Sequence, residues 1–236
     1  MAYGRLVWNI DAIIGAYGVK DGFEIGALVE PTGIAYNATI VKTGGVRPGC
    51  YGAVFGAGPI GLGCIALMRQ AGAAKIFAFE MNPGRRELAR KFGADHIYNP
   101  ADLARDGVSV PELIMEQTRG WGLDVQVEAA GKPLATYPQM DRSMACGGVV
   151  INVAHSSDDE RTVVNLAQLG WLGSSVGGSN GHAGDGIFMR VIAMLASRRM
   201  DYRNMITARF GLDGAVDGIL EMARQNGGKI MIDPWK

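Results

Sequence analysis

Short apolar runs recur through the middle of the chain, and stretches with helical spacing separate them. The runs lie at 50–55, 75–80, 93–98, 123–131, 147–154 and 172–178. Between them, apolar residues follow helical spacing at 62–70, 87–92, 109–119 and 137–144. Strands buried on both faces of a parallel sheet have such short apolar runs, and helices connect them. The pattern therefore predicts an α/β fold with a doubly wound parallel sheet of six strands.

The amino end shows a different pattern. Apolar residues within 1–27 follow no clear period, and 16–22 is rich in turn-forming residues, so we expect no independent core there. A helix is predicted over 27–41. Pro31 suits its first turn, and the carboxylate of Glu30 suits the positive end of the helix dipole.

The carboxyl end also departs from the alternating pattern. Residues 187–197 predict an amphipathic helix, 215–224 a second helix and 229–232 a closing strand. Residues 162–166, before the sixth strand, are expected to be extended. The part of the chain after 180 is therefore distinct from the predicted sheet.

The composition is that of a globular protein and narrows the choice of partners. Of the 236 residues, 48% are hydrophobic and 19% are charged, and 23 Lys and Arg balance 23 Asp and Glu. Because no basic stripe interleaved with aromatic residues is present, we expect neither nucleic acid nor an anionic membrane as a partner. No apolar run reaches the ~18 residues of a membrane helix and no signal peptide is recognisable, so a cytoplasmic location is expected.

The cysteines give no sign of a redox or metal site. Cys50, Cys64 and Cys146 form no C-x-x-C pair, and an odd, widely spaced set argues against disulfides. Their apolar neighbours predict that all three are core residues.

The most specific motif is Gly56-Ala57-Gly58-Pro59-Ile60-Gly61, a G-x-G-x-x-G between a predicted strand and a predicted helix. Gly56 permits the tight turn, Gly58 lets a pyrophosphate approach the backbone, and Gly61 allows the helix to pack closely on the sheet. The helix start directs free N–H groups and a positive dipole end at the phosphates. Glu80 ends the second strand, close to the ~20-residue spacing at which an acid binds the ribose diol. The motif predicts a bound dinucleotide, and Glu80 favours NAD.

Four motifs together resemble one enzyme family. They are Leu28-Val29-Glu30-Pro31, Arg47-Pro48-Gly49, Gly56 to Leu62, and Phe92-Gly93-Ala94-Asp95. In their order and spacing, residues 27–236 resemble the medium-chain, zinc-dependent dehydrogenases of the sorbitol and threonine dehydrogenase type. Within that family, 35–38 and 181–184 look closest to the scyllo-inosose dehydrogenases. The resemblance implies a Rossmann fold and hydride transfer from an alcohol, polyol, cyclitol or sugar to NAD.

The resemblance also implies which residues bind the cofactor. The three motif glycines with Pro59 and Ile60 would line the pyrophosphate and the nicotinamide ribose, and Glu80 would hold the adenosine ribose. The other implied positions are Met81 and Arg85 beside the adenine, Ala129 and Ala130 at the end of the fourth strand, Asn152, Val153, Ala154, Ser174, Ser175 and Val176 around the carboxamide, and Lys229 near the phosphates.

Several polar residues have both a functional and a structural interpretation. Arg85-Arg86 would suit a 2′-phosphate, but beside Glu80 we interpret them as a solvated helix start. His96 lies beside a predicted strand and is interpreted as structural. His155 and His182 are interpreted as loop residues, although both lie where a substrate would approach.

A metal site is predicted only in part. Glu30 matches the glutamate that ligates zinc in polyol dehydrogenases, and its alternative role is that of a helix-start carboxylate. A catalytic zinc takes three protein ligands, and no Cys or His precedes Glu30. Zinc is therefore expected only with ligands from outside this chain.

The resemblance divides the chain into three parts. These are a catalytic-lobe remnant and connecting helix at 1–48, a dinucleotide-binding domain at 49–179, and a returning segment of the lobe at 180–236. Because the family's N-terminal lobe has no counterpart here, we expect the lone chain to bind NAD without oxidising an alcohol. Two alternatives stay open: a non-catalytic NAD-binding protein or subunit that needs a partner chain, and a zinc-free reductase of the quinone or enoyl type. A homo-oligomer formed through 162–166 and 172–176 is also expected.

Overall fold

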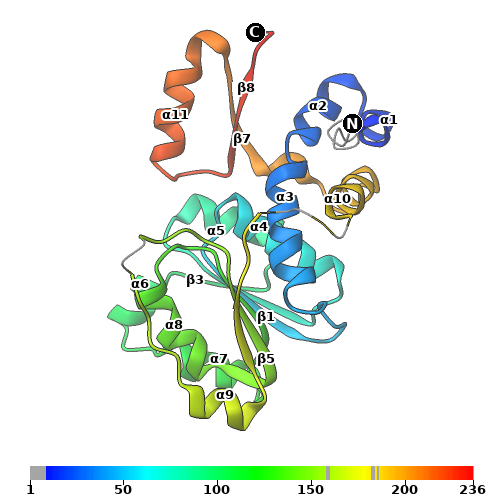
Figure 1. Ribbon diagram of the computed structural model, residues 1–236. Helices are drawn as coiled ribbons and strands as arrows, with labels where there is room; N and C mark the ends of the chain where they lie inside the picture. The colour runs from blue at the N-terminus through cyan, green and yellow to red at the C-terminus, as the bar shows by residue number, and fades with distance from the viewer. Residues whose placement is uncertain (1–8, 158–159, 182–183, 185, 236) are drawn as a thin grey trace.

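The protein is built around a six-stranded parallel sheet. The computed structural model describes residues 9–157, 160–181, 184 and 186–235. The strand order is β3-β2-β1-β4-β5-β6, and every neighbouring pair is parallel, as the apolar pattern predicts (Figure 1). The strands are β1 Tyr51–Phe55, β2 Lys75–Phe79, β3 His96–Tyr98, β4 Leu123–Glu128, β5 Met144–Asn152 and β6 Ser175–Gly178. The chain adds β2 and β3 on one side of β1 and then returns to add β4, β5 and β6 on its other side. Such sheets bind ligands at this change, between the carboxyl ends of β1 and β4.

Helices cover both faces of the sheet and enclose two cores. On one face Val54 and Ile76 share a core with Ile65 of the helix that follows β1. On the other face Phe55 and Phe79 stack with ring centroids 4.6 Å apart. The first face carries α3 Val29–Tyr36, α4 Pro59–Gln70 and α5 Pro83–Lys91; the second carries α6 Pro100–Arg105, α7 Val110–Gln117, α8 Pro133–Arg142 and α9 Leu166–Leu172. None of the helices in the described part of the chain is long and apolar enough to cross a membrane.

The amino end forms two helices where no core is expected. They are α1 Asp11–Tyr17 and α2 Val19–Gly26, and they bury Ile13 and Ile25 completely. The prediction for 16–22 was wrong because each helix buries so few apolar residues that no period appears in the sequence. Both are instead stabilised by packing, and α1 packs on α10 Ile187–Ala196.

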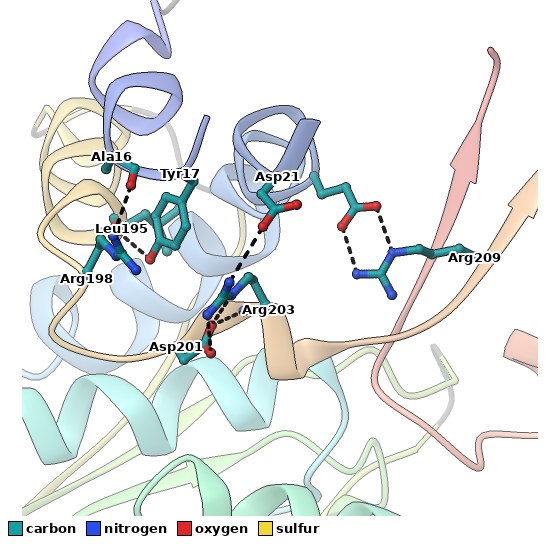
Figure 2. Close-up of polar contacts among 9 residues, drawn as sticks. Ala16, Tyr17, Asp21, Leu195, Arg198, Asp201, Arg203 and Arg209 are labelled. Carbon is teal, nitrogen blue, oxygen red and sulfur yellow. Dashed lines mark hydrogen bonds and ion pairs between the residues drawn. The ribbon is translucent and has the colours of Figure 1, made fainter. Parts of the chain in front are cut away.

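Polar contacts also tie the amino end to the carboxyl end (Figure 2). The hydroxyl of Tyr17 donates to the carbonyl oxygen of Leu195 at 3.2 Å. Arg203 lies 3.6 Å from the Asp21 carboxylate and also donates to Asp201. Its hydrogen bond to Asp201 holds the pKa of that carboxyl below the usual value, against the opposing effect of burial. Segments about 180 residues apart in the chain are thus one structural unit.

The region after the sixth strand contains a strand that the sequence does not indicate. A two-stranded parallel sheet joins β7 Ile206–Gly211 to β8 Lys229–Asp233, with α11 Ala215–Ala223 packed on it. Figure 1 shows this unit standing apart from the six-stranded sheet. Short helical turns, η2 Asn37–Val41, η3 Tyr202–Met205 and η4 Leu212–Gly214, complete the described elements.

Two boundaries near the sixth strand also differ from expectation. Residues 162–165 form no regular secondary structure, and α9 begins at Leu166, which was expected to be extended. The sixth strand starts only at Ser175, because Leu172 still belongs to α9 and Gly173 ends that helix in the left-handed conformation.

Candidate functional site

The G-x-G-x-x-G turn has the geometry that a dinucleotide requires. Gly56 has a φ of +93°, and a Cβ on it would lie 2.7 Å from the amide nitrogen of Ala130 after β4. A Cβ on Gly61 would lie 2.0 Å from the carbonyl oxygen of Gly56. Only glycine fits at either position, so the turn brings β1, α4 and the end of β4 as close together as the backbone allows.

The start of α4 presents unsatisfied backbone donors beside this turn. Gly58 is the N-cap and has no side chain to occupy them, and Pro59 is the first helical residue. The first intrahelical bond runs from the Leu62 amide to the Gly58 carbonyl at 2.8 Å, so the amides of Ile60 and Gly61 precede the helical ladder. A negatively charged group fits this helix start.

Glu80 fastens the end of β2 to the glycine turn. Its carboxylate is 8% exposed and accepts from the Ala57 amide at 2.7 Å and from the Asn82 amide at 2.8 Å. One accepted bond on each oxygen leaves further lone pairs for two hydroxyl donors. The predicted position of Glu80 at the carboxyl edge of the sheet is confirmed, and its arrangement fits a ribose diol.

Arg85 and Arg86 lie in the first turn of α5, as the sequence suggests, but both side chains are partly buried. The Nε of Arg85 donates to the Gly227 carbonyl at 2.9 Å, and a Cβ on Gly58 would lie 3.8 Å from the Arg85 Nη1. Burial lowers the pKa of Arg85, while Glu80 opposes that shift. Arg86 donates to the Glu80 carbonyl at 3.0 Å. Both guanidinium groups are held by backbone carbonyls at the edge formed by the glycine turn and Glu80, the candidate cofactor edge.

Glu128 is a site residue that the sequence prediction missed. It ends β4 with no exposed surface, and its carboxylate accepts from the amides of Ala130, Gly131 and Lys132 at 3.2–3.3 Å. Ala129 in turn donates its amide to the Phe55 carbonyl at 2.8 Å. The acid therefore shapes the loop against which the glycine turn packs. An acid that closes a buried strand, as in Leu123–Glu128, is the signal that marks it.

With this edge in place, the chain can be compared with known proteins. The model of the family described as "Zinc-binding dehydrogenase" matches residues 59–197. This chain belongs to the zinc-binding dehydrogenase family. The resemblance drawn from the sequence motifs is thereby confirmed, and so is the doubly wound fold that it implies.

Individual relatives agree with the family. Scyllo-inosose 3-dehydrogenase of Thermotoga maritima is 34% identical over 213 residues, which are 89% of this chain and 52% of that protein. A solved structure from Thermotoga maritima matches 96% of this chain and 57% of its own, with a TM-score of 0.87 and 32% identity. A solved structure from Sinorhizobium meliloti 1021, bound to NADP, matches 89% of this chain and 59% of its own, with a TM-score of 0.78 and 26% identity. The chain thus spans about half the length of the curated relative it matches.

The end of β5 contributes backbone groups to the same edge of the sheet. The amides of Val153 and Ala154 donate to the Glu128 carbonyl at 3.0 and 3.2 Å. The side-chain amide of Asn152 donates to the Ala154 carbonyl at 3.3 Å. These predicted positions therefore lie beside the loop that follows β4.

The predicted positions on β6 do not reach that edge. Ser175 pairs with Val149 and Val176 with Val150, whereas Asn152 pairs with Gly178. Ser174, at the amino end of β6, donates instead to the Ala145 carbonyl at 3.4 Å. Because β6 starts later than the apolar run suggests, 174–176 lie towards the amino end of the strand, and Gly178 and Ser179 lie beside Asn152 instead. The contact of 174–176 with a carboxamide stays a prediction that this register does not favour.

Two predicted contacts lie at the margin of the site. Met81 follows Glu80 and is 66% exposed, as a residue beside an adenine would be. Lys229 begins β8, two residues after the Gly227 carbonyl that accepts from Arg85. Its approach to the phosphates stays a prediction.

The described residues do not fit a zinc ion. Glu30 is exposed in the first turn of α3. Nowhere in the described ranges do three His, Cys, Asp or Glu side chains gather closely enough to hold a metal. Of the histidines, His96 stacks on Phe77 with ring centroids 4.9 Å apart, which agrees with a structural role. His155 is exposed, and His182 lies outside the described residues.

Two of the three cysteines match the core prediction. Cys50 and Cys64 are buried, and burial raises the pKa of their thiols to about 11 and about 12. Cys146 is exposed, so its assignment to the core was wrong. It lies where the ladder between β4 and β5 is irregular, next to Gly147 with a φ of +70°. The irregularity turns its side chain out of the alternation of the strand.

Proposed function

We propose that this chain is the cofactor-binding part of an NAD-dependent dehydrogenase that oxidises a polyol, cyclitol or sugar alcohol. The observation that carries the proposal is the buried carboxylate of Glu80, which joins the end of β2 to the Ala57 amide of the glycine turn. An acid at this place is suited to the two hydroxyls of an adenosine ribose.

The charges at this edge support NAD over NADP. A 2′-phosphate would meet the Glu80 carboxylate in a site with little water, and like charges in such a site are strongly unfavourable. Arg85 would offset this repulsion only in part, since its Nε already donates to the Gly227 carbonyl. The NADP of the Sinorhizobium relative is the reason to test the choice directly.

The residues of this chain would orient the cofactor. The amides at the start of α4 would hold the pyrophosphate, and the Glu128 carboxylate would fix the loop at 130–132 against which the cofactor crosses the sheet. When bound, the nicotinamide supplies the acceptor for hydride. The substrate class rests on relatives such as the scyllo-inosose 3-dehydrogenase.

The test is calorimetric titration of NAD and NADP into the wild type and Glu80→Ala. We expect NAD to bind the wild type at least about tenfold more tightly than NADP, the equivalent of one lost charge-assisted interaction. In Glu80→Ala, NAD should weaken and the preference should narrow. Glu87→Ala, on the exposed face of α5, is the control, because Glu87 is exposed and pairs with Arg90 of the same helix. NADP binding equal to or tighter than NAD in the wild type would reject the proposal for Glu80.

A second candidate, a non-catalytic NAD-binding subunit, is favoured by one observation. No group of three potential metal ligands is present in the described part of the chain. Metal analysis and NADH formation from scyllo-inositol or xylitol separate the candidates. Stoichiometric zinc with turnover by the purified chain would remove the second candidate. Cofactor binding without turnover agrees with both candidates, because the first assigns only the cofactor-binding part to this chain.

A further inference from the structure

A hollow of about 660 Å³ lies at the amino ends of β1, β4 and β5. Its lining includes Arg47 before β1, Arg119 and Trp121 before β4, Asp124 at the start of β4, and Cys146 in β5. The glycine turn and Glu80 lie at the carboxyl ends of β1 and β2. The hollow and the cofactor edge are therefore at opposite ends of the sheet.

The topology of the sheet explains why a hollow forms here. The chain reaches β1 through the turn at 43–49, after η2 on the face of α3 and α4, and reaches β4 through 118–122, after α7 on the other face. These entering loops diverge where β1 and β4 are neighbours. A change of face between adjacent strands leaves a crevice at the carboxyl edge, and the same divergence here leaves one at the amino edge.

The hollow carries positive charge that the protein does not neutralise. Neither Arg47 nor Arg119 has an ion-pair or hydrogen-bond partner for its side chain in the described structure. The carboxylate of Asp124 is already engaged, since its oxygens accept from the Tyr51 amide at 2.8 Å and from the Trp121 indole at 3.2 Å. Two guanidinium groups are therefore available to an anion that enters the hollow.

Arg119 is held at this place by an unusual backbone. It follows α7 with a φ of +54°, a conformation that glycine adopts more easily than any residue with a side chain. The Gly120 amide closes the end of the helix by donating to the Met115 carbonyl at 2.7 Å. The turn thus carries an arginine at the position where glycine would be more stable.

Trp121 adds a flat apolar surface to the charged groups. Its side chain is 62% exposed, and the hydrogen bond from its indole nitrogen to Asp124 fixes the ring. An orientated indole beside arginines suits a ligand that has both a ring and an anionic group.

We propose that the hollow is a second binding site, which takes a small organic anion with a carboxylate or phosphate attached to a flat ring. The ring packs on Trp121, and the anionic group is held by Arg47 and Arg119. The site is independent of the NAD assignment, because it shares no residue with the cofactor edge.

Nuclear magnetic resonance of the tryptophan indoles tests the site without an activity assay. The chain has 4 tryptophans, and Trp121→Phe identifies the Trp121 signal by its loss. The probes are 1-naphthyl phosphate, 1-naphthoate, neutral 1-naphthol and inorganic phosphate. We expect the two aromatic anions to shift the Trp121 signal with dissociation constants of ~0.01–1 mM, and the two comparison compounds to bind far more weakly. The tighter of the two aromatic anions shows whether phosphate or carboxylate is preferred.

Arginine variants decide whether the anion is recognised. Arg47→Ala and Arg119→Gly should each weaken 1-naphthyl phosphate about tenfold, as expected for the loss of one charge-assisted hydrogen bond. Arg119→Gly suits the positive φ, so it should not impair folding. Arg105→Ala is the control, because Arg105 is exposed on α6 and paired with Asp102 and Asp106. The proposal is overturned by an unmoved Trp121 signal, by unchanged affinity in both arginine variants, or by equal binding of 1-naphthol.

Discussion

The six-stranded sheet and the two-stranded sheet are stabilised in different ways. In the first, apolar side chains such as Ile65 and Phe77 have no exposed surface. In the second, Ile219 and Leu220 of α11 are 60% and 56% exposed. The six-stranded sheet therefore has cores of its own, whereas the β7–β8 unit presents much of its apolar surface to solvent.

The helices of the two regions show the origin of the difference. Helix α4 lies between the sheet and α3, so all its residues from Gly61 to Met68 are buried. Helix α11 packs on β7 and β8 through Gly218, where a Cβ would lie 2.9 Å from Ile232. Its larger apolar side chains, Val216, Ile219, Leu220 and Met222, are all more than half exposed. Polar links such as the bond from Arg85 to the Gly227 carbonyl take a larger part in holding this unit to the rest.

The largest expected effect comes from truncating one apolar side chain to alanine in each of the two regions. Ile65→Ala should lower the free energy of unfolding by about 2–5 kcal/mol, because it leaves a cavity in a closed core. Leu220→Ala should change it by less than ~0.5 kcal/mol, because the side chain is already in water. Urea unfolding followed by circular dichroism measures both. A similar loss of unfolding free energy for Leu220→Ala would contradict the comparison, because it would mean that Leu220 is covered by another chain or segment.

A second pair of substitutions sharpens the comparison at glycine positions. Gly61→Ala should destabilise the chain by about 3 kcal/mol and abolish dinucleotide binding, because the new Cβ would lie 2.0 Å from the Gly56 carbonyl oxygen. Gly170→Ala in α9 has nothing within 4 Å and should stabilise by about 0.5–1 kcal/mol. Thermal unfolding and NAD calorimetry measure both. Normal NAD affinity in Gly61→Ala would show that the turn tolerates a side chain.

The sequence predicts the closed region better than the open one. The six strands follow from apolar runs, because strands buried on both faces leave little choice of residue. Helices α4, α5, α7 and α8 follow from helical spacing, whereas α6 and α9 were not predicted. The turn at Gly56 to Gly61 follows from glycine spacing, because its close contacts exclude any side chain. These features depend on local constraints that a sequence records directly.

Features that depend on long-range packing could not be predicted. Helix α1 forms against α10, and β7 pairs with a strand about 20 residues further on. The position of Ser175 depends on where α9 ends, which shifts the register of β6 relative to β5. Glu128 was missed because its hydrogen-bond donors are backbone amides of the loop that follows it, and these leave no recognisable motif in the sequence.

A third expected effect concerns the edge of the six-stranded sheet. β6 is an edge strand of this sheet. Val163, Leu166 and Trp171, which precede it in the chain, are 87%, 77% and 89% exposed. Pairing of two such edges would bury this surface, so we expect the chain to self-associate. Trp171→Glu should weaken the association about thirtyfold, as for an interfacial tryptophan hot spot. Sedimentation equilibrium measures it, with Trp121→Phe as the control. A wild type that stays monomeric at micromolar concentration would reject the proposed contact.

The smallest expected effect tests the polar attachment of the β7–β8 unit. Arg209 in β7 holds Glu24 in α2 through two bonds of 2.7 Å each. The pair is partly exposed, with 38% and 18% of the two side chains accessible, so its net contribution should be only about 0.5–1 kcal/mol. A double-mutant cycle with Arg209→Met and Glu24→Gln isolates this coupling energy. Because salt screens partly exposed charges, the coupling should fall in 1 M sodium chloride, whereas the cost of Ile65→Ala should not. A coupling that is zero at low salt would mean that other contacts, such as the bond from Arg85 to the Gly227 carbonyl, hold the unit instead.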